Sequence, residues 1–344
     1  MTARRAVLLS MGLAAVVPQR ALAGEPASSA VDVVAAIAPE PGSAVASAIL
    51  VGSAGQLYHP AGPGRWQRRS GGGTSVDLRA AVRAAPRSDE VLAIGADTPL
   101  FRFRGGAWRA EPLSNRGPAS LSATGPLPVL AVGRHIHALE SGAWVRLASA
   151  ASRASAAWAA GPKGLVVALA DGALARFDGR RFSPLRSPLA AGDAVVILLG
   201  ASAAAIYGRA ESGAWIRIDR GGTAALSPAA ELAGFEEHAA GLGPDGALLL
   251  AGTLPAANGA RRAVLARADR NRLVPAGDLP PLTAGDRVAV LLGHPSTGEI
   301  LIATRAGAVR MRDKTGTWTE GSASAALPPP ARTVQRSGGP ARTR

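Results

Sequence analysis

Short apolar runs recur along the chain at a nearly regular interval. In the clearest copy, the run VLAIG begins at Val91, residues 100–103 then alternate apolar side chains with arginine, and a glycine turn leads to Trp108. Successive copies of the run begin 36 to 53 residues apart. The seven copies begin at Ile49, Val91, Val129, Leu165, Ala204, Ala247 and Ile300. A period of about 40–50 residues with several short strands per unit is typical of β-propellers.

Each copy is long enough for four strands. In the second copy we expect an inner strand at 78–84, then strands at 91–94 and 100–103, and an outer strand that begins at Trp108. Turn-forming residues between the first two strands recur at 86–88, 161–164, 243–246 and 295–298. We therefore predict an all-β fold, a seven-bladed β-propeller of four-stranded antiparallel blades over residues 31–325.

Most copies end with a glycine turn followed by an aromatic residue. We expect each ring to open the outer strand and to wedge between neighbouring blades, burying ~150–250 Å². These residues are Trp66, Trp108, Trp144, Phe182, Trp215 and Trp318. The fifth copy leaves little room for a third strand between Ala205 and Trp215. The sixth has Leu273 in place of the aromatic and an insertion at 254–261.

Two stretches carry resemblances to known propellers. The sequence RDKTGTW at 312–318 resembles the blade ending of kelch-type propellers, and it also looks like the Asp-box of bacterial sialidases. The sequence EHAAGLGPDG at 237–246 is similar to NHL-type and streptogramin-lyase propellers. The lyase resemblance implies His and Glu at the mouth of the channel, moving protons. The signatures of WD-type propellers are absent.

The two ends of the chain differ from the repeats. Residues 1–23 read as a signal peptide, with Arg4 and Arg5, a mostly apolar run, and a small-residue ending at Ala21–Ala23. Residues 24–30 form a short linker. Residues 326–344 form a basic tail, which we expect to be disordered. We predict export to the periplasm or beyond the cell by a Sec or twin-arginine signal, with no transmembrane segment after cleavage.

The high net charge of the chain does not by itself indicate a nucleic-acid partner. The formal net charge is +14, but the signal region and the tail contribute half of it, and 36 of the 38 basic residues are arginine. A nucleic-acid groove would combine clustered cations with stacking aromatics, so no nucleic-acid partner is expected. The chain has no cysteine, which excludes disulfides, thiolate metal sites and a cysteine nucleophile.

Histidines and one glutamate are the candidate site residues. Glu237 and His238 lie at the expected start of an inner strand, where a base beside a carboxylate suits proton transfer. His294 ends another inner strand. His135 and His137 are two apart on a strand, so they share a face and are candidates for binding. Polar residues at strand entrances also explain each of these positions without a functional site, and we predict no metal and no cofactor.

These observations favour a non-catalytic binding or scaffolding module over an enzyme. We expect a protein or glycan partner in the cell envelope, and a monomer. The alternative is a lyase or hydrolase with its site at the channel mouth. An enzyme concentrates titratable groups with perturbed pKa values around one mouth, whereas a binding module presents a broad patch on one face.

Overall fold

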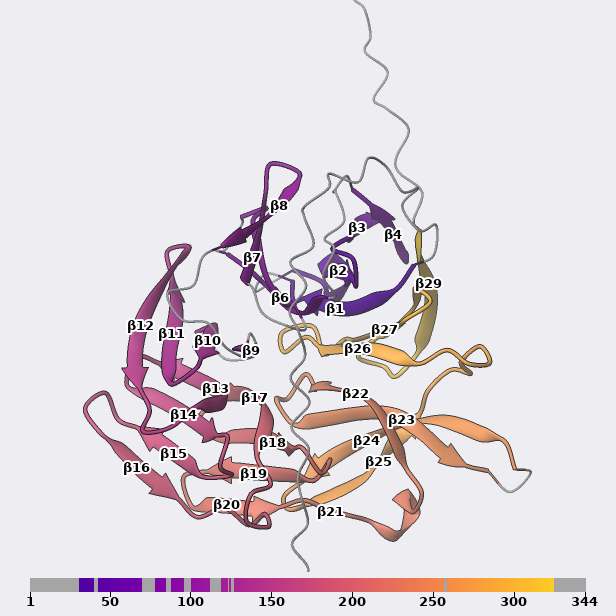
Figure 1. Ribbon diagram of the computed structural model, residues 1–344. Coiled ribbons are helices and arrows are strands. Elements are labelled where there is room, and N and C mark those ends of the chain that lie inside the picture. The colour runs from indigo at the N-terminus through magenta and orange to yellow at the C-terminus, as the bar shows by residue number, and fades with distance from the viewer. Residues whose placement is uncertain are drawn as a thin grey trace, which may run out of the picture.

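The computed structural model describes residues 31–39, 43–69, 78–84, 88–95, 100–111, 119–122, 124, 127–256 and 259–324. These residues form β-strands and two short 3₁₀ helices, η1 (Val45–Ser47) and η2 (Ala230–Leu232), without an α-helix among them. The strands belong to six sheets, which surround a common centre (Figure 1). The predicted signal peptide at 1–23, linker at 24–30 and tail at 326–344 lie outside the described residues.

The strands follow one another in antiparallel groups of four, which we call blades 1 to 7 in chain order. Blade 1 contains β1 (Val33–Ile37), β2 (Ile49–Gly52), β3 (Leu57–Gly62) and β4 (Arg65–Arg68). Blade 2 contains β5 (Leu78–Arg83), β6 (Val91–Gly95), β7 (Leu100–Arg104) and β8 (Ala107–Glu111). Blade 3 contains β9 (Ala119–Ser122), β10 (Val129–Val132), β11 (His135–Glu140) and β12 (Ala143–Ser149). Blade 4 contains β13 (Ala154–Gly161), β14 (Gly164–Leu169), β15 (Leu174–Phe177) and β16 (Phe182–Leu185).

The remaining blades follow the same order. Blade 5 contains β17 (Val195–Ser202), β18 (Ala205–Ala210), β19 (Trp215–Asp219) and β20 (Gly222–Ala225). Blade 6 contains β22 (Glu236–Leu242), β23 (Leu248–Pro255), β24 (Arg261–Asp269) and β25 (Arg272–Asp278), and the short β21 (Ser227–Pro228) pairs with β25. Blade 7 contains β26 (Val288–Gly293), β27 (Ile300–Thr304), β28 (Ala308–Arg312) and β29 (Trp318–Ser324).

Blades 1 and 7 join into a single eight-stranded sheet. Their outer strands β4 and β29 pair in parallel, with Arg65 opposite Ser322 and Gln67 opposite Ser324. The two ends of the repeat array are therefore hydrogen-bonded along their outer edges. The inner strands β1, β5, β9, β13, β17, β22 and β26 also contact one another in order around the centre, and β26 contacts β1. The six sheets thus fit the predicted propeller, with two of its blades fused.

The core lies between the blades. Each neighbouring pair of blades shares one buried hydrophobic cluster: Leu92 meets Leu130 between blades 2 and 3, Trp158 meets Ile206 between blades 4 and 5, and Trp66 meets Leu301 between blades 7 and 1. The other four interfaces follow the same rule. Face-to-face packing therefore proceeds around the whole ring.

The sequence predicted the second strands well, and it misplaced one aromatic residue. All seven apolar runs lie on the second strand of a blade. Trp215, however, opens the third strand β19 and not the outer strand, because the turn at Gly213 joins the second and third strands of blade 5. The third strand therefore begins at Trp215. No strand has to fit between Ala205 and Trp215 other than the second one. The insertion at 254–261 lengthens the β23–β24 hairpin, and Leu273 lies on the outer strand β25 as expected.

The inner strands run in the same direction around the centre. Between blades 6 and 7, a β-carbon on Gly241 would overlap the carbonyl oxygen of Leu291, and one on Gly293 would lie 2.5 Å from that of Leu242. The ends of β22 and β26 are therefore side by side, and so are their starts. We call the starts of the inner strands the inner rim, because they lie on one face of the ring around its centre.

Candidate binding site at the inner rim

A β-bulge recurs in the inner strands. In all but one of them, the register with the second strand shifts close to the first residue, so that one residue is left without a partner. Bulges re-aim side chains and are common beside functional sites. The bulged residues are Val34, Arg79, Ser155, Val196, His238 and Ala289. The same position of the repeat thus carries five residue types in six blades: Val, Arg, Ser, His and Ala.

Glu237 fastens blade 6 to blade 5. Its Oε1 lies 2.9 Å from Nε of Arg209, and its Oε2 accepts a hydrogen bond of 2.7 Å from the indole N–H of Trp215. Arg209 is on β18 and Trp215 is on β19, and both side chains are largely buried. Each carboxylate oxygen already has a partner in the neighbouring blade. The geometry therefore gives Glu237 a structural role in the blade interface.

His238 occupies the bulge next to it. Its Nδ1 is buried and has no hydrogen-bond partner among the described residues. Burial lowers the pKa of His238, and Glu236 opposes this while Arg287 and Arg261 add to it. Glu236 is in turn paired with Arg261 at 3.2 Å and with Arg287 at 3.8 Å. His238 is therefore held as the neutral imidazole at neutral pH, beside a carboxylate that two arginines neutralise.

His294 does not share this site. It follows the last residue of β26, whereas His238 lies near the first residue of β22, so the two histidines are at opposite ends of neighbouring inner strands. The His294 side chain is 5% exposed, and its Nδ1 lies 3.1 Å from the hydroxyl of Ser296. Its backbone N–H donates to Glu299 and its carbonyl accepts from Gly298. His294 does end an inner strand, as the sequence indicated, and it is a buried turn residue.

His135 and His137 share one face of β11, as expected. His135 Nδ1 lies 2.8 Å from the hydroxyl of Ser149. Burial lowers the pKa of His137, and His135 and Arg146 add to the effect. Arg146 is the residue opposite His137 on β12. A guanidinium beside this pair disfavours a bound cation, and no three His, Asp or Glu side chains cluster as metal ligands in the part of the chain that the structure describes.

Acidic residues before the inner strands hold the adjoining turns, which the sequence analysis missed. Asp193 accepts from the N–H and the hydroxyl of Ser212 at 3.1 and 2.6 Å, and Asp286 accepts from the N–H of Ala306 at 3.2 Å. Both follow a glycine and stand just before an inner strand. The repeated Gly-Asp pairs at 192–193 and 285–286 are the signal that marks these contacts. They fix the geometry of the rim.

The Asp313 turn, which carries the kelch and Asp-box resemblance, is a self-contained structure. Asp313 Oδ1 accepts from the N–H of Thr315 at 2.8 Å and from that of Thr317 at 2.9 Å. The hydrogen bond from the Thr315 hydroxyl is the main reason why the pKa of Asp313 is lowered. The aspartate thus stabilises the hairpin that precedes Trp318.

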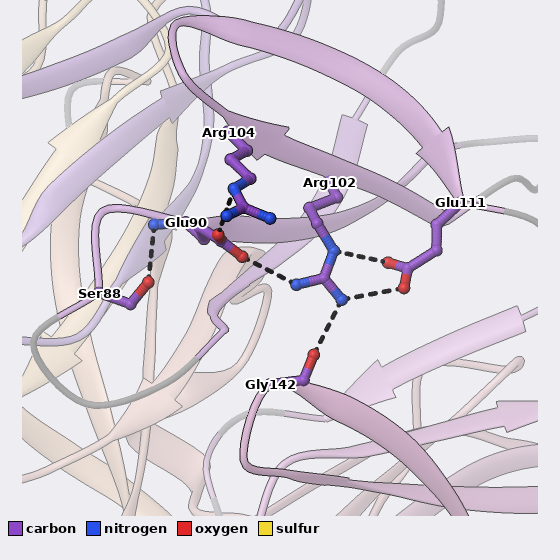
Figure 2. Close-up of polar contacts among 6 residues, drawn as sticks. All are labelled: Ser88, Glu90, Arg102, Arg104, Glu111 and Gly142. Carbon is purple, nitrogen blue, oxygen red and sulfur yellow. Dashed lines mark hydrogen bonds and ion pairs between the residues drawn. The ribbon is translucent and has the colours of Figure 1, made fainter.

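An ionic network joins blades 2 and 3 (Figure 2). Arg102 on β7 donates to both oxygens of Glu111 at 3.2 and 2.9 Å, to Glu90 at 2.9 Å, and to the carbonyl of Gly142 in the next blade at 2.9 Å. Arg104 lies 3.0 Å from the other oxygen of Glu90. Hydrogen bonding to Glu111 raises the pKa of Arg102. Arg176 makes a similar contact between blades 4 and 5, because it donates to the carbonyl of Asp219 at 2.9 Å.

A surface cavity of about 730 Å³ lies at the junction of blades 7 and 1, and His238 is not among the residues that line it. Asp32, Arg305 and Asp286 line it, and Arg305 is paired with Asp32 at 2.9 Å. Its walls are otherwise short loops and small side chains. Among the described residues, no helix is long and apolar enough to cross a membrane.

Comparison with known proteins identifies the fold. No family model and no curated protein sequence matches the chain. Among solved structures, the WD40 β-propeller domain of Doa1 matches with a TM-score of 0.55 at 14% identity, over 82% of this chain and 92% of that one. YCF48 from Cyanidioschyzon merolae matches with a TM-score of 0.51 at 13% identity, over 81% and 95%.

A third structure agrees with these two. Sqt1 of Saccharomyces cerevisiae matches with a TM-score of 0.51 at 11% identity, over 85% of each chain. Likenesses at such low identity bear on the fold alone. The sheets, the ring of inner strands and these structures together show a β-propeller repeat protein without a specific family.

Proposed function

We propose that this protein is a non-catalytic binding module, exported to the cell envelope, which holds a protein partner on its inner rim. The observation that carries the proposal is the bulged position of the inner strands. The chemistry of the bulged residue changes from blade to blade, from alanine and valine to arginine and histidine. Val34 and Ala289 pack against the clusters between blades, and the Ser155 hydroxyl donates to the carbonyl of Val195. The bulged side chains that can serve recognition are therefore Arg79, Val196 and His238.

The rim offers both apolar and charged contacts. Ile197, directly after the bulged Val196, is 39% exposed, and it is one of two large hydrophobic side chains exposed in the described part of the chain. Arg79 is exposed at the bulge of blade 2. An apolar anchor within a polar surround is the usual composition of a protein-binding surface. A glycan partner would instead call for exposed aromatic rings, and the exposed large hydrophobic residues include none.

The proposal of export rests on the sequence of residues 1–23. The enzyme alternative keeps one observation in its favour, the buried and unpartnered Nδ1 of His238. A neutral imidazole can act as a general base. Its neighbour Glu237 is, however, committed to Arg209 and Trp215, so His238 would work without the carboxylate that the lyase resemblance implies.

The test is a capture experiment with the purified full chain as bait against an envelope extract, followed by calorimetry with the captured protein after its purification. We expect a stoichiometric complex whose affinity falls at least tenfold in Ile197→Ser and changes less than twofold in Val145→Ser. Val145 is the matched control, because it is 44% exposed but lies on the outer strand β12. A captured protein that binds both variants equally, or that is processed by the wild type and not by His238→Gln, would overturn the proposal.

A further inference from the structure

The arginines on the face of the ring that carries the inner rim, including those of the turns between second and third strands, fall into two groups. Those of blades 5, 6 and 7 are all paired: Arg209 with Glu237, Arg261 and Arg287 with Glu236, and Arg305 with Asp32. Three exposed arginines lie at the same face near the centre of blades 2, 3 and 4: Arg79, Arg134 and Arg153. In the structure as described, none of these three has an acidic side chain within 4 Å.

The backbone fixes the positions of these three arginines. Arg79 sits in the bulge of β5, and the N–H of the preceding Leu78 donates to Ser53 at 2.9 Å. The carbonyl of Arg134, in the β10–β11 turn, accepts from Ala150 at 2.8 Å. The carbonyl of Arg153 accepts from Ala170 at 2.9 Å. Guanidinium groups on such anchored turns lose less freedom on binding than those on mobile loops.

Arg134 and Arg153 also belong to one connected piece of structure. The N–H of Ala154, directly after Arg153, donates to the carbonyl of Gly133, directly before Arg134, at 2.7 Å. The turn of blade 3 and the entry to blade 4 are therefore hydrogen-bonded to each other. Arg79 stands at the start of the inner strand of the preceding blade, and β5 contacts β9 of blade 3. The three cations thus follow consecutive blades along one arc of the rim.

We propose that the arc formed by Arg79, Arg134 and Arg153 binds an acidic segment of the partner protein, an inference that rests on the binding function proposed above. Carboxylates are the ligands that match arginine, because a guanidinium donates two parallel hydrogen bonds to them. The acidic side chain of Asp171, in the turn after the second strand of blade 4, accepts hydrogen bonds from the hydroxyl of Ser152 and from the N–H of Ala173. In blades 5 to 7 the arginines pair with acidic side chains of this chain. A partner segment with spaced Asp or Glu would supply the matching carboxylates for Arg79, Arg134 and Arg153.

A protein segment fits the arc better than a single-stranded nucleic acid. Nucleic-acid grooves combine cations with aromatic rings on which the bases stack. No aromatic ring is among the exposed large hydrophobic side chains of the described residues, and Tyr58, Trp66, Trp158, Tyr207 and Trp215 are 5% exposed or less. The arc therefore offers charge without a stacking platform.

The test measures the binding of a fluorescent octaglutamate peptide to the full-length protein by anisotropy at low salt. The variant Arg79→Gln/Arg134→Gln/Arg153→Gln is compared with Arg109→Gln/Arg146→Gln/Arg272→Gln. The second triple removes the same charge from exposed arginines on the outer strands β8, β12 and β25. We expect the affinity to fall at least tenfold in the first triple and less than twofold in the second. Equal losses, or no binding to the wild type, would overturn the inference.

Two further measurements separate the possible failures. Oligo-dT of equal charge serves as a competitor, and a tighter affinity for it than for the peptide would reassign the arc to nucleic acid. The partner captured from the envelope extract is also titrated against both triples. If it binds the wild type and the first triple alike, the arc is not its site, although the binding function stands. If the wild type captures no partner, the binding function itself fails.

Discussion

The carbonyl oxygen of Gly64 occupies the place where a β-carbon on Gly321 would lie. Gly64 closes the turn before β4, and Gly321 is on β29, so this contact joins the first blade to the last. The same carbonyl accepts a hydrogen bond of 2.9 Å from the N–H of Ser322. The ring is closed at a point where two backbones touch directly and only glycine fits.

Gly321→Ala should therefore destabilise the protein by about 1–3 kcal/mol, the usual cost of forcing atoms into a packed site. The measurement is the free energy of unfolding in urea. Gly161→Ala is the control, because a β-carbon at Gly161 meets no atom within 4 Å, and it should change the free energy by less than about 0.5 kcal/mol. Similar values for the two variants would mean that blades 1 and 7 do not meet at Gly64.

Arg102→Ala should cost about 1–3 kcal/mol, because it removes charged hydrogen bonds to Glu111, Glu90 and Gly142 in a partly buried place. The control is Arg109→Ala. Arg109 pairs with Arg102 across the β7–β8 hairpin but is exposed, and its loss should cost less than about 0.5 kcal/mol. If Arg102→Ala were as stable as the control, the network of Figure 2 would not contribute to the stability of the fold.

The sequence predicted the parts of the fold that depend on local pattern. The apolar runs mark the second strands because those strands are buried on both faces, so their hydrophobicity is visible without a partner. Trp215 was misplaced because a glycine turn before an aromatic looks the same whether it joins the second and third strands or the third and fourth. Only the pairing of Tyr207 with Arg217 decides between them.

The candidate site was harder to predict, because its contacts are distant in the sequence. Glu237 and His238 do lie at the start of an inner strand, as their pattern indicated. The partners that give Glu237 its structural role, Arg209 and Trp215, come from the preceding blade. The bulges were also missed, since they follow from how two strands register against each other and leave no mark on either strand alone.

Glu237→Ala should cost about 1–3 kcal/mol, because the indole N–H of Trp215 loses its acceptor and the guanidinium of Arg209 loses its ion-pair partner. Trp215→Phe removes the donor together with part of a buried ring, so its own cost includes a cavity as well as the lost hydrogen bond. The double variant should lose less than the sum of the two, and this coupling is read from a double-mutant cycle of unfolding free energies. Additive losses would contradict the contact, and Glu211→Ala, an exposed acid nearby, gives the baseline.

The stability of the protein should fall as the pH drops below about 6.5, in part because of His238. Burial lowers the pKa of His238 in the folded state, whereas the unfolded chain takes up the proton near pH 6.5. Protonation therefore favours the unfolded state between these two values. His238→Gln should lose less free energy of unfolding than the wild type between pH 7.5 and 5.0. Equal losses in the two proteins would show that His238 titrates normally in the fold.

The pairing of β4 with β29 is the claim on which the ring, and hence the rim, depends. The chain has no cysteine, so the pair Arg65→Cys/Ser322→Cys reports on it without interference. Directly opposed residues of neighbouring strands have the spacing that a disulfide needs. We predict that mild oxidation links these two positions within one molecule, as read by mass spectrometry of the non-reduced digest, and that Arg109→Cys/Ser322→Cys stays reduced. Free thiols at 65 and 322, or links only between molecules, would contradict the closed ring.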